Sequence, residues 1–197
     1  MISLLLNCYF SFFKRYFLLV ILFTSILFNA PKTLLDSIDK LDADKMYDSE
    51  LVKLSNNIHI YPNDEEIFWR IARVHFELAD QTLDKKIHIK HFYPGLDAAK
   101  KALELNSDSY EGNHWYAVLI GKIGLLEGTE QKIKNSYEVE KYALRAIELN
   151  PNNDGTYHVM GRWHYELANL SWIEKKIASW VYETPPDGGF QDAIYFF

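Results

Sequence analysis

Apolar residues recur along much of the chain at steps of three to five positions, which is the spacing expected for one face of an α-helix. The clearest stripe contains Phe68, Ile71, Phe76 and Ala79. It follows residues 63–66, where a capping side chain precedes acidic residues that suit the positive end of a helix dipole. This pattern predicts a helix that begins at residues 63–66 and continues through Ala79.

Part of this pattern occurs again further along the chain. Residues 75–79 (HFELA) and 164–168 (HYELA) are near-copies 89 positions apart, and each lies the same distance after a proline-led turn. A polar turn at residues 105–108 lies half-way between them. The separation corresponds to two units of 44 to 45 residues, and a fixed period in the range of 20 to 50 residues indicates a repeat array.

The same periodicity predicts the other helices of the array, which we expect to form pairs. The first pair, within residues 33–60, has too few residues for two full helices and is expected to be compressed. Two loops, at residues 80–93 and 126–136, are expected to connect paired helices. They are also expected to hold the residues by which the period of 44 to 45 exceeds the 34 residues of a common helical repeat. The remaining predicted helices occupy residues 94–105, 110–126, 137–149 and, as a minimum, 154–168.

Residues 1–30 differ from the rest of the chain because they are mostly apolar. The run at residues 16–28 has the length of a signal-peptide core and is short of the roughly 20 residues that span a bilayer. A tilted anchor made from the whole segment would bury Lys14 and Arg15, at about 2.5–3.5 kcal/mol each. The segment also lacks acidic residues, as organelle-targeting leaders do. We therefore predict a hydrophobic anchor, leader or signal-like segment at residues 1–30, followed by a repeat domain at residues 31–197.

Charge and cysteine content exclude several classes of protein. The net charge is −6 and the acidic residues are spread along all of the 197-residue chain, whereas a nucleic-acid-binding protein needs a clustered basic surface. Cys8 is the only cysteine, which excludes an intramolecular disulfide framework and a cysteine-based zinc site. We therefore expect a globular protein that does not bind nucleic acid.

Short sequence features of the repeats are similar to those of tetratricopeptide repeats. Small residues recur at Ala72, Ala117 and Gly161, and the helix endings at residues 102–106 (ALELN) and 146–151 (AIELNP) have the same form. The resemblance implies an all-α fold of antiparallel helix hairpins that stack into a right-handed α-solenoid. The period of 44 to 45 residues exceeds the 34 that are usual for such repeats.

Longer segments resemble the regulator of microtubule dynamics family over residues 42–197. They are WRIAR at 69–73, KIKNSY at 132–137, HVMGRW at 158–163, KIAS at 176–179 and TPP at 184–186. The resemblance implies a non-catalytic helical-repeat adaptor that associates with microtubules and regulates microtubule or spindle dynamics through protein binding. Against the family pattern the last helix stops early, at residues 193–197, so we expect the array to be truncated at its C-terminus.

Residues that suggest catalysis or metal binding have simpler interpretations. In HFELA and HYELA the histidine and the glutamate are two positions apart, so on a helix they point about 200° apart and cannot share a ligand. His88 and His91 have no carboxylate or cysteine nearby in the sequence to complete a metal site. Residues 121–124 (GKIG) lack the order of a phosphate-binding loop. We expect no catalytic residues, no metal and no cofactor.

A partner-binding groove is the site that the repeats predict. In tetratricopeptide arrays the first helix of each pair lines a concave groove. The positions three before and one after each small residue are expected to face it. They form two rows, Trp69, His114 and His158 in one, and Arg73, Val118 and Arg162 in the other. The arginines and the tryptophan favour an acidic or mixed-charge ligand.

The expected partners are proteins, namely tubulin or microtubules, or proteins that associate with microtubules. The net charge of −6 opposes direct contact with acidic tubulin tails, so we expect contact through a local site or through a partner. The expected location is the cytoplasm, on the cytoskeleton or spindle. The alternative function is a tetratricopeptide scaffold held at a mitochondrial or endoplasmic-reticulum surface by residues 1–30, for membrane contact or lipid handling.

Overall fold

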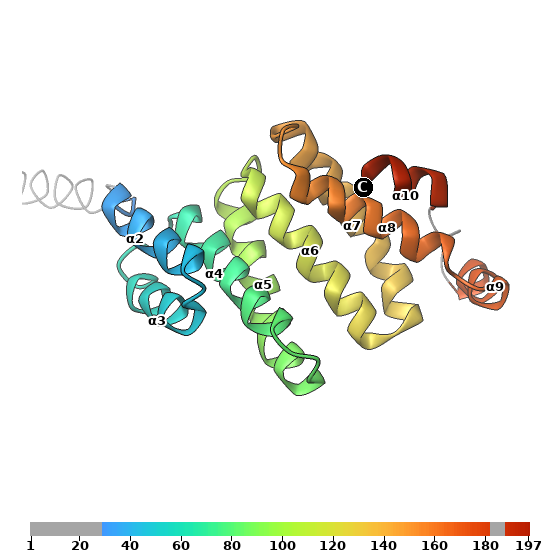
Figure 1. Cartoon of the computed structure of the whole chain (residues 1–197), viewed down its shortest axis with the longest axis horizontal. Helices are drawn as coiled ribbons and strands as arrows, with labels where there is room; N and C mark the ends of the chain where they lie inside the picture. The colour runs from blue at the N-terminus through green and yellow to red at the C-terminus, as the bar shows by residue number, and fades with distance from the viewer. Residues whose placement is uncertain (1–28, 182–187) are drawn as a thin grey trace, which may run out of the picture.

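The computed structural model describes residues 29–181 and 188–197, and every regular element in these two ranges is an α-helix (Figure 1). This confirms the predicted all-α class. The helices are α2 (Lys32–Ala43), α3 (Tyr47–Asn57), α4 (Glu65–Asp80), α5 (Lys85–Leu105), α6 (Tyr110–Glu127), α7 (Thr129–Leu149), α8 (Asp154–Ala168), α9 (Trp172–Val181) and α10 (Phe190–Phe196).

The helices form a row that extends from α2 at one end to α9 and α10 at the other (Figure 1). Helices α2 to α7 each pack against the next helix in the chain, α9 contacts α7, and α10 packs against α8. Helix α4 also contacts α6, and α6 contacts α8. One hydrophobic core continues through the row, from Ile38 in α2 to Leu170 just after α8. Alternate helices therefore share one side of the molecule.

Helices α4, α6 and α8 begin in the same way. In each, the side chain before the helix accepts a hydrogen bond from a backbone N–H of the first turn, which satisfies a donor that has no partner inside the helix. The capping residues are 45 and 44 positions apart, and a buried small residue follows each cap after eight positions. The caps are Asp64, Ser109 and Asn153, and the small residues are Ala72, Ala117 and Gly161. The predicted period therefore corresponds to repeated helix starts.

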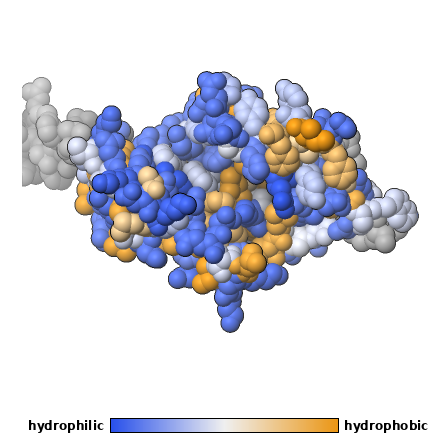
Figure 2. Space-filling view, in the orientation of Figure 1, coloured by the Kyte–Doolittle hydropathy of each residue, from blue (hydrophilic) through white to orange (hydrophobic). Residues whose placement is uncertain are grey.

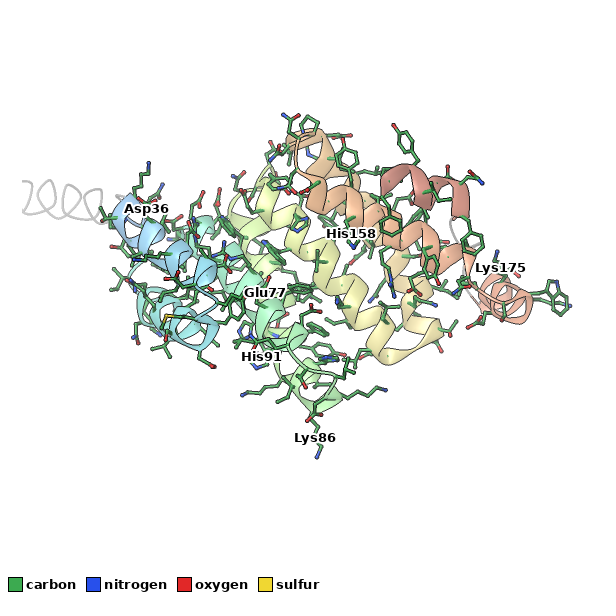
Figure 3. The ribbon with its side chains drawn as sticks, in the orientation of Figure 1. Asp36, Glu77, Lys86, His91, His158 and Lys175 are labelled. Atoms are coloured by element: carbon green, nitrogen blue, oxygen red, sulfur yellow. The ribbon has the colours of Figure 1, made fainter. Side chains whose placement is uncertain are left out.

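The predicted loop at residues 80–93 is wrong, because α5 already begins at Lys85. Asp84 caps it by accepting a hydrogen bond from the N–H of Lys86 at 2.9 Å, and Lys86 points away from the molecule at this end (Figure 3). Pro94 lies inside the helix, where a proline removes one hydrogen bond and costs about 3 kcal/mol. Burial of neighbours such as Phe92 and Leu96 opposes that cost.

The predicted loop at residues 126–136 is also wrong, because α7 begins at Thr129 and Gly128 alone connects it to α6. Gly128 has a φ of 105°, a backbone conformation that glycine adopts without strain. The first turns of α7 are helical because they bury Ile133 against the core. Helices α5 and α7 have 21 residues each, so the extra length of the period lies in helices and not in loops.

The first helix pair is short, as predicted, with 12 residues in α2 and 11 in α3.

The body of the protein includes Ala30, which is buried and donates its N–H to the Oδ2 of Asp64. Most of the predicted hydrophobic segment at residues 1–30 lies outside the described residues, so its role as an anchor, leader or signal stays a prediction. Among the helices that are described, none is both long enough and apolar enough to cross a bilayer.

Candidate binding groove

A cavity of about 850 Å³ lies on the side that α4, α6 and α8 share. Its walls include Phe76 from α4, Trp115 and Val118 from α6, and Val159 from α8. Figure 2 shows apolar side chains gathered along α6 and over α8 and α10 on the face that is turned to the viewer. A cavity of this volume, lined mainly by apolar side chains, has the character of a ligand-binding site.

The predicted groove residues separate into two groups. His114, Val118, His158 and Arg162 line the cavity, and His158 lies on α8 on the side that faces α6 (Figure 3). Trp69 and Arg73, the α4 members of the same two rows, do not line it. The rows therefore continue across α6 and α8 but are interrupted at α4, where the first helix pair packs.

Trp69 is part of the packed interior of the N-terminal end. Its side chain is buried, and its Nε1 donates to a carboxylate oxygen of Glu66 at 3.2 Å. The guanidinium of Arg70 lies 4.0 Å from the centre of the indole ring, a favourable cation–π contact. The indole nitrogen and the ring of Trp69 thus contact residues of the same chain, and Trp69 is not among the residues that line the cavity.

Arg73 joins three helices through ion pairs. Its Nη2 lies 2.9 Å from a carboxylate oxygen of Glu50 in α3 and 3.1 Å from one of Asp39 in α2, and its Nε lies 3.3 Å from Asp42. The side chain of Glu50 has no exposed surface. Arg73 is therefore held by carboxylates inside the structure, and we assign it to the packing of α2 and α3 on α4.

The carboxylates of this cluster differ in their pKa values. Burial raises the pKa of Glu50 to about 7, although the hydrogen bond and charge of Arg73 act in the opposite direction. Burial likewise raises the pKa of Asp42. For Asp39 burial also acts upward, but the combined hydrogen bonds and charges of Arg70 and Arg73 outweigh it and lower its pKa. Glu50 is consequently the member of the cluster that titrates near neutral pH.

His114 is a neutral polar group in the cavity wall. Its Nδ1 lies 2.9 Å from the Oγ1 of Thr156, and the hydroxyl of Tyr110 lies 3.2 Å from the same oxygen. Burial lowers the pKa of His114 to about 4, so the imidazole is uncharged at neutral pH. Because Thr156 is fully buried, this contact fixes the orientation of the His114 ring.

The cations of the cavity wall are paired with carboxylates of the same wall. Lys122 lies 2.9 Å from Asp80, while Lys132 and Arg162 lie 3.5 Å and 2.7 Å from Glu166. Glu166 belongs to the HYELA segment, and its partner Arg162 is one turn earlier on α8. These pairs balance the charge of the wall. The prediction of an acidic or mixed-charge ligand from the sequence did not take the paired carboxylates into account.

Two aromatic residues near the C-terminus, Phe196 and Phe197, line the cavity. Phe196 stacks on His164 with ring centres 5.3 Å apart, and the ring of Phe197 lies 5.0 Å from that of His158. Gly161 makes the second contact possible, because a Cβ at this position would be 2.9 Å from ring atoms of Phe197. The small residue of α8 thus admits an aromatic ring, a contact that helix periodicity does not reveal.

The two similar segments at 75–79 and 164–168 carry no common chemistry. His75 shares a 3.0 Å contact between Nδ1 atoms with His91, whereas Glu77 is hydrogen-bonded to Tyr47 of α3. His88 contacts the carbonyl of Thr82. In the described parts of the chain, no three histidine, cysteine or acidic side chains are grouped so that they could hold a metal ion.

The groups that set the polarity of the cavity have no signal in the local sequence pattern, with one exception. Asp80, Lys122 and Lys132 come from three different helices, so no local pattern connects them. The pair of Arg162 with Glu166 could have been found, because a spacing of four residues places both on one helix face. The Thr156 contact with His114 joins residues 42 positions apart and has no local signal either.

Comparison with known proteins gives a consistent family. The model of the family described as "Regulator of microtubule dynamics protein 1-3" matches residues 34–197. Regulator of microtubule dynamics protein 1 of Bos taurus is 36% identical over 159 residues, which cover 79% of this chain and 50% of that protein. Regulator of microtubule dynamics protein 3 of Xenopus laevis is 32% identical over 144 residues, which cover 73% of this chain and 31% of that protein.

The chain spans half or less of the length of these relatives. The matched region includes α4 to α8 and the cavity between them. The match to the family model extends over most of the chain and confirms the resemblance seen in the sequence. The chain belongs to the regulator of microtubule dynamics protein 1-3 family.

Proposed function

We propose that this chain is a non-catalytic adaptor that acts on microtubule dynamics by holding a segment of a partner protein in its groove. In this proposal α4 to α8 are tetratricopeptide-like hairpins of a right-handed α-solenoid, and the groove is the cavity defined above. The observation that carries the proposal is that α4, α6 and α8, which begin at the repeat period, line one apolar cavity. The names of the relatives supply the connection to microtubules.

The polar groups of the cavity support binding rather than catalysis. A nucleophile needs a neighbouring base within hydrogen-bond reach. Ser136, which lines the cavity, donates its hydroxyl to the carbonyl of Ile133 at 2.7 Å instead. His114 is oriented by Thr156, and Glu166 is occupied by Lys132 and Arg162. These side chains hold one another in place and form a rigid wall suited to recognition.

The charge of the chain favours an indirect or local contact with microtubules. A net charge of −6 is repelled by an acidic surface at long range, and this repulsion weakens with added salt. An adaptor that recognises a microtubule-associated protein avoids the repulsion, and we favour this arrangement. The location that follows is the cytoskeleton.

Co-sedimentation over a salt series tests the proposal. The chain is mixed either with microtubules of purified tubulin or with microtubules that retain their associated proteins, and the pelleted fraction is measured. We expect strong pelleting with the second preparation, and less with the first. Absence of pelleting from both preparations at low salt would overturn the proposal.

A further inference from the structure

We propose that the groove selects a peptide segment without net charge that carries apolar side chains, and that His114 donates a hydrogen bond from Nε2 to a carbonyl oxygen of that segment. This inference rests on the proposed function, because it concerns the same groove.

The charge of the cavity wall is balanced. Three cations and three carboxylates line it, and each cation lies within 3.5 Å of a carboxylate of the same wall. The cations are Lys122, Lys132 and Arg162, and the carboxylates are Asp80, Asp154 and Glu166. An acidic segment would have to compete with Asp80 and Glu166 for these cations. A segment without net charge leaves the ion pairs intact and is therefore the complementary ligand.

The wall offers apolar surface between these pairs. Phe76, Trp115, Val118 and Val159 line the cavity and are partly exposed, so they are available to a ligand. They come from the three alternate helices α4, α6 and α8, so the apolar surface extends along the row of helices. Bound apolar side chains would remove this surface from water, and that is the main source of affinity in such sites.

His114 supplies a directed polar contact within the apolar surface. Its Nδ1 is occupied by Thr156, which leaves Nε2 as the ring nitrogen for a ligand. The hydroxyl of Tyr110 and the Nδ1 of His114 both lie within hydrogen-bond distance of the Thr156 hydroxyl. We assign the donors by acidity: the Tyr110 phenol, the most acidic of the three groups, donates to Thr156, and Thr156 in turn donates to Nδ1. A neutral imidazole that accepts at Nδ1 carries its proton on Nε2. It therefore presents a donor and matches an uncharged acceptor such as an amide carbonyl.

A selection from random peptides tests the ligand class. A phage-displayed library of random 12-residue peptides is selected against the full chain, against Val118→Glu in the cavity wall, and against Val52→Glu as a control. Val52 is 60% exposed on α3 and does not line the cavity. We expect the full chain and the control to enrich apolar peptides without net charge, and Val118→Glu to enrich none. Circular dichroism confirms that each variant is folded.

The outcomes separate the inference from the proposed function. Enrichment of acidic peptides that is lost with Val118→Glu would overturn the ligand class and leave the groove in place. Enrichment that is unchanged by Val118→Glu, or no enrichment at all, would overturn both the inference and binding in the groove.

The role of His114 is tested with a synthetic peptide from the selection. We expect His114→Leu to weaken its binding about tenfold, the effect of one lost hydrogen bond to a buried donor site. His114→Gln carries an amide donor near the position of Nε2 and is expected to restore most of the affinity. Equal affinity of the Leu variant and the unchanged chain would remove His114 from the recognition.

Discussion

Arg73 of α4 donates a hydrogen bond of 2.9 Å to Glu50 of α3, a carboxylate that has no exposed surface. The second oxygen of Glu50 is buried without a hydrogen-bond partner among the described residues. The interaction therefore depends on one arginine that also contacts Asp39 and Asp42 of α2. It connects the first helix pair to the helix from which the groove begins.

Replacing Arg73 tests whether it is a structural residue. Arg73→Ala is expected to lower the free energy of unfolding by about 3–5 kcal/mol at pH 8, because it leaves the buried carboxylate of Glu50 without its partner. The measurement is urea unfolding followed by circular dichroism. Arg162→Ala is the matched control, since Arg162 occupies the equivalent repeat position but its side chain is 58% exposed.

For the control we expect a loss of less than about 1 kcal/mol, the usual range for an exposed ion pair. Equal losses for the two variants would show that the ion-pair cluster does not hold α2 and α3 on α4.

The buried carboxyl of Glu50 is expected to make stability depend on pH. Its pKa is about 7 in the folded protein and 4.5 ordinarily, so between these values the folded state binds more protons than the unfolded state. The contribution of Glu50 to the free energy of unfolding therefore falls as pH rises from 4.5 to 7. His75 and His114 act in the opposite direction, because burial lowers the pKa of each to about 4.

The comparison with Glu50→Gln isolates this contribution. We expect the chain to lose stability relative to Glu50→Gln as pH rises through the window, with the histidine contributions cancelling in the difference. Urea unfolding of both proteins at intervals from pH 4.5 to 7.5 gives the values. A difference that does not vary with pH would contradict a raised pKa for Glu50.

Two glycines of α6 are expected to respond in opposite ways to alanine. A Cβ on Gly124 would lie 3.0 Å from the backbone Cα of Lys132, so α6 and α7 would have to separate. A Cβ on Gly121 would only meet a methyl group of Val139 at 3.4 Å. Gly124→Ala is expected to destabilise by roughly 1–3 kcal/mol, whereas Gly121→Ala gains about 0.5–1 kcal/mol from helix propensity.

Thermal unfolding of both glycine variants checks this prediction. Stabilisation by Gly124→Ala would show that α6 and α7 do not approach as closely as described.

Local sequence patterns predicted much of the fold but less of the site. The helix starts of α4, α6 and α8 were predictable because caps and small residues are local signals that recur with the period. Pro94 was misleading, because proline commonly opens a helix, and its place inside α5 depends on burial that only the folded protein shows. The start of α7 at Thr129 was missed for a similar reason, because the burial of Ile133 in its first turns is seen only in the folded protein.

The groove shows the same division between local and long-range information. Periodicity placed His114, His158 and Arg162 on one side, and these residues do line the cavity. It also placed Trp69 and Arg73 there, because a helical period cannot indicate that α2 and α3 cover the same side of α4. That covering involves the burial of Ile38 and Leu54 in the core and ion pairs across as many as 34 positions of the sequence.

Binding to microtubules by a variant of the cavity wall tests the central claim most directly. Val118→Glu places a carboxylate in the apolar wall, and the cost of removing that charge from water opposes the binding of an apolar segment. Val52→Glu adds the same charge on exposed α3. Co-sedimentation at low salt, with microtubules that retain their associated proteins, is predicted to give at least about tenfold weaker binding for Val118→Glu and unchanged binding for Val52→Glu. Equal binding of folded Val118→Glu and the unchanged chain would contradict the groove as the site of partner recognition.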